Sequence, residues 1–127
     1  MGRIFGAIRV DGKQCRTLFD SGARNTYIAA GAAEGQPRTH LPTPRPAALG
    51  GRVRLIREGC YLVGTLEGKP IEVDAYVLDE IGPDDDGRPI EILFGALAMQ
   101  KWGIRLLPEE ERLDLSRYPE EFTEFAG

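Results

Sequence analysis

The first twenty residues alternate between apolar and polar or charged side chains, the pattern of half-buried β-strands. The side chains expected on one side of the first strand are Ile4, Gly6, Ile8 and Val10. Asp11-Gly12 follows, and this pair suits a type I′ turn, whose two central residues need positive φ. We therefore predict a hairpin whose return strand runs from Lys13 to Phe19 and ends at Asp20.

A second hairpin is indicated in the middle of the chain. The apolar segment 60–66 leads into Glu67-Gly68, and a strand with a period of two follows. Its inward side chains are expected to be Ile71, Val73, Ala75 and Val77. Residues 53–57 predict a further, separate strand. Two segments rich in proline and glycine, 31–51 and 81–89, are predicted to be loops.

The last third of the chain predicts a strand followed by a helix. Residues 92–94 form an apolar run that ends at Gly95, and 96–102 contains good helix formers with Gly103 as a C-terminal stop. The fold class is therefore expected to be mainly β with one short helix near the C-terminus.

After the helix, residues 104–107 and 112–115 flank a Pro-Glu-Glu-Glu turn and predict a last hairpin. We expect one domain over residues 1–117 and an acidic C-terminal tail over 118–127. The two phenylalanines of this tail could pack on a partner subunit or mark a segment that is trimmed, and the sequence leaves both possibilities open. Trp102 is predicted to be a core or interface aromatic rather than a ligand platform.

Composition narrows the possible functions. The chain has 127 residues, of which 42% are apolar and 28% charged, as in soluble globular proteins. Its net charge of -4 argues against nucleic-acid binding, which usually requires a basic stripe. There is no run of eighteen apolar residues and no secretory signal pattern, so we expect neither membrane association nor export, and a cytoplasmic location.

Few residues are available for metal or cofactor chemistry. Cys15 and Cys60 match no metal-ligand spacing and are predicted to be reduced, partly buried thiols. A Ser-His or Cys-His mechanism would have to use His40, the only histidine, which falls in a predicted loop. The run Asp84 to Asp86 lacks the alternating ligands of a calcium loop and is predicted to be a solvated turn. No metal and no cofactor are therefore expected.

The chemistry is concentrated in the segment TLFDSGARNTYI, residues 17–28. A turn would explain Ser21 and Gly22 but not the return to apolar sequence after Thr26. Later in the chain, residues 92–95 (ILFG) stand directly before the predicted helix. This order of a hairpin, apolar-apolar-Asp-Ser-Gly-Ala and then apolar-apolar-Gly before a helix resembles the retropepsin-like, retroviral-type aspartic proteases. The resemblance covers roughly residues 4–115.

The resemblance implies a closed acid-protease barrel lobe that acts as a homodimer. Each subunit would give one Asp20, and the two carboxylates would share one proton, activate a water and hydrolyse a peptide bond. By the same resemblance, Ser21 braces the two loops across the twofold axis, and Gly22 offers its N–H to the carboxylates. Gly95 lets its strand lie under the Asp20 loop. The remaining supports of this loop are Ala23 and Thr26.

A mobile flap should close over the peptide substrate. Residues 47–51 are the candidate tip, and the expected substrate contacts are Arg24, Ala48, Leu49, Gly50 and Gly51. Arg24 stands where retroviral enzymes usually have an acidic residue, and Ala96 follows Gly95 where they have an arginine. Subsite preference is therefore expected to differ from that of the viral enzymes, and Arg24 suggests a preference for acidic substrate residues.

Three interpretations of Asp20 remain open at this stage. The preferred one is an aspartic endopeptidase. The second is a catalytically inactive retropepsin-like module for dimerisation or peptide binding. The third is an unrelated small β-domain that binds a metabolite in a pocket remote from Asp20, with Asp20 serving only as a turn residue.

Overall fold

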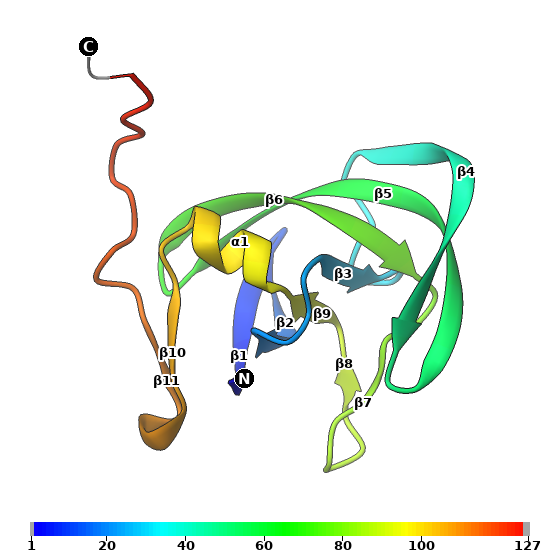
Figure 1. Cartoon of the computed structure of the whole chain (residues 1–127), viewed down its shortest axis with the longest axis horizontal. Helices are drawn as coiled ribbons and strands as arrows, with labels where there is room; N and C mark the ends of the chain where they lie inside the picture. Colours follow the sequence, from blue (N-terminus) through cyan, green and yellow to red (C-terminus); the bar gives the residue numbers. More distant parts are fainter. Residues whose placement is uncertain (1, 126–127) are drawn as a thin grey trace.

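The computed structural model describes residues 2–125, which form a strongly bent β-sheet with one short helix (Figure 1). The first six strands are β1 (Arg3–Val10), β2 (Lys13–Asp20), β3 (Thr26–Ala29), β4 (Arg38–Leu49), β5 (Arg52–Leu66) and β6 (Lys69–Leu78). The later elements are β7 (Gly82–Pro83), β8 (Pro89–Ile90), β9 (Ile92–Phe94), α1 (Ala96–Lys101), β10 (Arg105–Leu107), the 3₁₀ turn η1 (Pro108–Glu110) and β11 (Arg112–Asp114). The mainly β class with one short helix is confirmed.

The main sheet has the strand order β1-β2-β9-β3-β6-β5-β4. A further pairing of Arg9 in β1 with Thr65 in β5 brings the sheet round on itself, so that six strands form a ring and β4 remains outside it. β9 runs parallel to β2 and antiparallel to β3. The ring thus places the end of β2, which carries Asp20, beside the strand that leads into Gly95.

Both predicted tight hairpins are present. Asp11 and Gly12 have φ of 50° and 79°, as a type I′ turn requires, and the register of β1 with β2 pairs Val10 with Lys13. Glu67 and Gly68 have φ of 49° and 80° between β5 and β6. In each case two turn residues with left-handed backbone match the right-handed twist of the flanking strands.

The prediction of a loop over 31–51 was wrong for residues 38–49, which form β4, and the predicted strands 53–57 and 60–66 are parts of the single strand β5. Among the described residues β4 pairs only with β5, so its other edge has no strand partner there. An unpaired edge needs no backbone N–H donor, so prolines are tolerated on it. The three prolines of β4, Pro42, Pro44 and Pro46, also discourage pairing of this edge with a strand of another chain. The register shifts between His40 and Arg45, which marks the irregularity that the prolines introduce.

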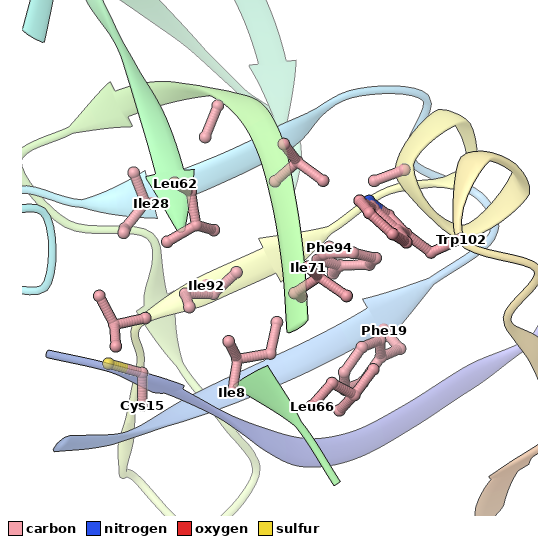
Figure 2. Packing of buried hydrophobic residues seen from close by; sticks show 14 of the residues in the cluster. Ile8, Cys15, Phe19, Ile28, Leu62, Leu66, Ile71, Ile92, Phe94 and Trp102 are labelled. Carbon is pink, nitrogen blue, oxygen red and sulfur yellow. The ribbon is translucent and has the colours of Figure 1, made fainter. Parts of the chain in front are cut away.

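The main core fills the inside of the ring. Phe19 of β2 and Phe94 of β9 are fully buried and their ring centroids lie 5.3 Å apart. Figure 2 shows these rings beside Ile71 and Leu66, with Ile8 and Ile92 further along. The inward positions predicted by alternation are confirmed as buried for Ile4, Ile8, Val10, Ile71, Val73, Ala75 and Val77.

Trp102 is a core aromatic, as predicted, and is 3% exposed. Its indole N–H donates to the Glu72 carbonyl at 3.0 Å, and its ring stacks on Tyr118 with centroids 5.7 Å apart. Phe122 packs on the same ring at 5.6 Å, while Phe125 is 89% exposed. The described part of the tail is therefore docked on its own chain as far as Phe122; the boundary at 117 stays a prediction, and residues 126–127 lie outside the described range.

We predict that Phe94→Ala lowers the free energy of unfolding by about 3–5 kcal/mol, because it leaves a cavity against Phe19 at the centre of the core. Phe125→Ala serves as the matched control, since this ring is exposed, and should leave stability unchanged. Urea denaturation followed by tryptophan fluorescence measures both. Equal stability of the two variants would contradict the assigned core.

Candidate active site

The Asp20 side chain is held in a short loop at the end of β2, which we call the Asp loop (residues 20–25). The Gly22 N–H donates to Asp20 Oδ1 at 2.8 Å, and the Ala23 N–H donates to the Asp20 carbonyl at 3.1 Å. The Asp20 side chain is 22% exposed, so one carboxylate oxygen is fixed by the loop while the group can still be reached from solvent. This is the geometry of an oriented acid at the surface of the molecule.

Ser21 ties the loop to the N-terminal strand. The Gly2 N–H donates to Ser21 Oγ at 2.8 Å, and the Ser21 N–H donates to the Gly2 carbonyl at 3.1 Å. Ser21 and Gly22 are both exposed. Because the backbone on each side of Ser21 is fixed, its hydroxyl is presented at the surface in a defined position.

Gly95 lies directly beneath the Asp loop. A Cβ added there would stand 2.2 Å from the Asn25 carbonyl oxygen and 2.8 Å from that of Arg24, so no other residue fits without moving the loop. The Gly95 N–H donates to Thr26 Oγ1 at 3.1 Å in a buried position. A tight backbone contact and a buried hydrogen bond therefore join two segments that are far apart in sequence.

The start of α1 completes this junction. The Ala96 N–H donates to the Ala23 carbonyl at 2.7 Å, and the Leu97 N–H donates to the Arg24 carbonyl at 3.1 Å. The Arg24 side chain is exposed, so the residue is held by its backbone alone. Six residues predicted for the site are thus brought together around one loop: Asp20, Ser21, Gly22, Ala23, Thr26 and Gly95.

Arg3 is a neighbour of Asp20 that the sequence analysis missed. Its Nε lies 3.8 Å from Asp20 Oδ2, and its own side chain is 63% exposed. The signal was present in the sequence, because a two-residue turn at Asp11-Gly12 fixes the register and places Arg3 opposite Asp20. The pair is open to solvent, which weakens it.

A second apolar cluster lies beside the Asp loop and was also not foreseen. Its buried members are Leu18, Tyr27, Ile56, Leu78, Ile90 and Leu93, with Ala23, Leu41, Ala47, Leu49, Tyr76 and Ile81 packed against them. It connects Leu18 of β2, Ala23 of the Asp loop, and Ala47 and Leu49 at the end of β4. The cluster therefore packs the β4–β5 hairpin, the Asp loop and the end of β2 against one another.

The predicted flap tip is the turn of the β4–β5 hairpin. Gly50 and Gly51 have φ of 56° and 79° and connect the two strands. Leu49 belongs to the second apolar cluster, whereas Ala48 alternates to the opposite face and is exposed. The pairing of β5 with β6 begins only at Glu58. Residues 45–56, which we call the hairpin tip, therefore form a two-stranded ribbon that extends beyond the ring.

A depression of about 570 Å³ lies between α1 and strands β5 and β6. Asn25 and Thr26 border it, but Asp20, Ser21 and Gly22 do not. It could hold a small molecule apart from Asp20, as the third interpretation requires. It is partly open to solvent, so a ligand there would bury only part of its surface.

The segment after β6 is held by Asp84, whose side chain is 2% exposed rather than solvated as predicted. Arg16 Nε donates to Asp84 Oδ2 at 2.5 Å, and the N–H groups of Asp86 and Arg88 donate to Oδ1 at 2.9 Å. Burial by itself raises the pKa of Asp84, but these hydrogen bonds and the Arg16 charge outweigh it and lower the pKa below its ordinary 3.8.

Other titratable groups offer no second site. Burial raises the pKa of both Cys15 and Cys60, which are free thiols, so they stay protonated and unreactive near neutral pH. Within residues 2–125 no three histidine, cysteine or acidic side chains converge in a way that could hold a metal ion. Nor does that range contain a helix long and apolar enough to cross a membrane.

Comparison with solved structures supports the fold. The retroviral protease-like domain of Ddi1 from Leishmania major matches with a TM-score of 0.62 and 15% identity, over 91% of this chain and 90% of that one. EIAV protease, complexed with the inhibitor HBY-793, matches with a TM-score of 0.58 and 16% identity, over 84% of this chain and 93% of that one.

The protease-reverse transcriptase of a foamy virus, in complex with an RNA/DNA hybrid, matches with a TM-score of 0.50 and 12% identity, over 83% of this chain and 12% of that one. No family model and no curated protein sequence matches this chain. The chain therefore has a retropepsin-like fold, as the two sequence motifs predicted.

We predict that Gly95→Ala destabilises the protein by at least about 1–3 kcal/mol, because its methyl group would overlap the Asn25 and Arg24 carbonyls and displace the Asp loop. Gly31→Ala is the matched control, since nothing lies within 4 Å of a Cβ there. Thermal denaturation of both variants measures the effect. A Gly95→Ala protein as stable as Gly31→Ala would disprove the close packing.

We further predict that Asp84→Asn destabilises the protein at neutral pH and that this difference narrows as pH falls. The lowered pKa means that the ionised Asp84 contributes stability above its unfolded pKa and loses it as pH drops through the folded value. Urea denaturation between pH 7 and about pH 3 measures it, with exposed Asp85→Asn as the control. A difference that does not depend on pH would rule out the carboxylate as the cause.

Proposed function

We propose that this protein is a homodimeric aspartic endopeptidase of the cytoplasm that hydrolyses peptide bonds in protein or peptide substrates. The observation that carries the proposal is the Asp loop. A carboxylate at the end of an interior strand is oriented by the Gly22 N–H and remains accessible, and its loop lies above the backbone of Gly95. A turn aspartate would not need the glycine beneath its loop.

One subunit supplies half of this site. A water can be activated and a carbonyl polarised by carboxyl groups only if one is ionised and another is protonated, and the Asp loop has a single carboxylate. Exposed Ser21 and Gly22 are suited to meet the same residues of a second copy across a twofold axis. The two Asp20 side chains would then lie within hydrogen-bonding reach and share a proton.

The reaction follows from that pair. The ionised Asp20 accepts a proton from a water, the protonated Asp20 of the other subunit donates to the scissile carbonyl oxygen, and the water oxygen bonds to the carbonyl carbon. Collapse of the tetrahedral intermediate, with a proton passed to the amine, releases both products and restores the shared proton. No covalent enzyme intermediate and no cofactor is needed. The hairpin tip would close over the peptide and exclude bulk water.

A catalytically inactive module for dimerisation or peptide binding is the second candidate, and the position of Arg3 favours it. A guanidinium 3.8 Å from Asp20 Oδ2 competes for this oxygen with the water and the second carboxyl group that the dyad needs there. Arg3 is 63% exposed, so this ion pair is weak and easily given up, which is why we rank the enzyme first.

We predict that Asp20→Asn lowers the rate of peptide cleavage by at least about a thousandfold, because general acid-base catalysis is lost, without dissociating the dimer. Cleavage of an unfolded protein is assayed at acid to neutral pH, where the optimum should lie on the acid side. Sedimentation analysis reports the oligomeric state, and exposed Asp85→Asn is the matched control.

Activity that survives in Asp20→Asn would refute this chemistry. Peptide binding without turnover at any pH would favour the inactive module instead. A protein that remains monomeric at micromolar concentration, with or without a peptide inhibitor, would count against both.

A further inference from the structure

Charge is unevenly distributed along this acidic chain. Residues 38–57, which form β4, its turn and the first part of β5, contain five of the sixteen basic residues and none of the twenty acidic ones. The five are Arg38, Arg45, Arg52, Arg54 and Arg57. A hairpin of this kind in a protein with a net charge of -4 is a local cationic surface.

The strand register decides which face of the hairpin tip these arginines occupy. Residues directly opposite each other in an antiparallel pair point to the same face, and Arg45 pairs with Ile56, Ala47 with Arg54, and Leu49 with Arg52. Ile56, Ala47 and Leu49 belong to the apolar cluster beside the Asp loop. Three arginines therefore lie on the face of the hairpin that turns towards this cluster.

The opposite face of the hairpin tip differs in character. Val53 and Leu55 are 75% and 51% exposed there, next to Ala48 and Arg57. Figure 1 shows the β4–β5 hairpin curving away from the ring at the end of the molecule opposite the C-terminal tail. The arginine-bearing face is thus the inner one with respect to the second apolar cluster.

Some of these arginines already have partners. Arg38 forms an ion pair with Glu58 at 3.1 Å, and Arg54 donates to the backbone carbonyls of Glu80 and Ile81. Arg45 and Arg52 are exposed, and within residues 2–125 neither makes an ion pair with a carboxylate. These two guanidinium groups are available to a ligand.

Three carboxylates reduce the positive potential at one side. Glu58, Asp79 and Glu80 border a depression of about 480 Å³ together with Arg52, Arg54 and Arg57. Glu58 pairs with Arg38, and neither Asp79 nor Glu80 forms an ion pair with the hairpin arginines in the described range. The cationic surface is consequently strongest towards Arg45.

We propose that Arg45 and Arg52, on the hairpin tip, bind acidic side chains of an extended peptide substrate. The planar guanidinium matches a carboxylate in a two-point contact, and half-buried Ala47 and Leu49 supply apolar contacts between the charges. Exposed Arg24 adds a further positive charge on the Asp loop. The preference for a glutamate-rich substrate deepens the proposed function and rests on it.

The test uses two labelled peptides with the same apolar centre, one flanked by glutamates and the other by glutamines. Binding is measured by fluorescence anisotropy on Asp20→Asn protein, and cleavage is measured on the unchanged chain. The glutamate peptide should bind at least about tenfold more tightly, the gain of one charge-assisted contact. High salt should reduce this preference.

The variants Arg45→Gln and Arg52→Gln, combined, should abolish most of the preference while leaving binding of the glutamine peptide unchanged. Arg9→Gln with Arg117→Gln removes the same charge from exposed positions outside the hairpin and is the matched control. Thermal denaturation verifies that all variants fold. Equal binding of the two peptides, or a preference that survives in the Arg45 and Arg52 variant, would overturn the proposal.

The outcomes separate this inference from the proposed function. Cleavage of both peptides at equal rates would leave the protease standing and refute the acidic preference. Arginine-dependent binding of the glutamate peptide without any cleavage would refute the protease and support the preference. Tighter, arginine-dependent binding of a single-stranded RNA would identify a site for nucleic acid and overturn the acidic-peptide assignment, and no binding of any probe would refute both ideas.

Discussion

The contact between Gly95 and the Asp loop is the constraint on which the candidate site depends. The Asn25 carbonyl oxygen leaves no room for a Cβ at position 95. Hydrogen bonds from the N–H groups of Gly95, Ala96 and Leu97 to the Asp loop and Thr26 cross the same junction. Backbone packed this closely has two consequences. It leaves no room for a side chain beneath the loop, and it fixes the loop backbone that follows Gly22, whose N–H orients the Asp20 carboxylate.

Much of this fold could be predicted from short-range patterns. The Asp11-Gly12 turn set the register of β1 and β2, alternation assigned the buried faces, and the glycine after residues 92–94 marked the second half of the site. Each of these signals depends on local geometry: a positive φ, a period of two, or the absence of a Cβ. The six residues around the Asp loop were identifiable for the same reason.

The features that were missed arise from pairing across the molecule. The segment 38–49 contains prolines that argue for a loop, but a strand at the edge of a sheet lacks the requirement that excludes proline. Asp84 was expected in solvent, and only the fold brings Arg16 to it across 68 residues of sequence. Likewise, the apolar cluster beside Asp20 combines residues from several strands, and no window of sequence contains them together.

The candidate site is formed by two parts of the chain, the β1–β2 hairpin that ends at Asp20 and the contact between Thr26 and Gly95. These two parts differ in the length of the chain loop that must close to form them. The first part follows a two-residue turn, so β1 and β2 can pair while only a short loop is closed. The second part requires Thr26 to find Gly95, 69 residues further along, and the entropy of closing a loop rises with its length. We therefore expect Asp20 to reach the end of its strand early in folding, and its loop to be fixed in place only when β9 inserts between β2 and β3. An early state with only the hairpin formed would carry the acid but not the complete loop, so the proposed peptidase would be inactive until β9 is in place.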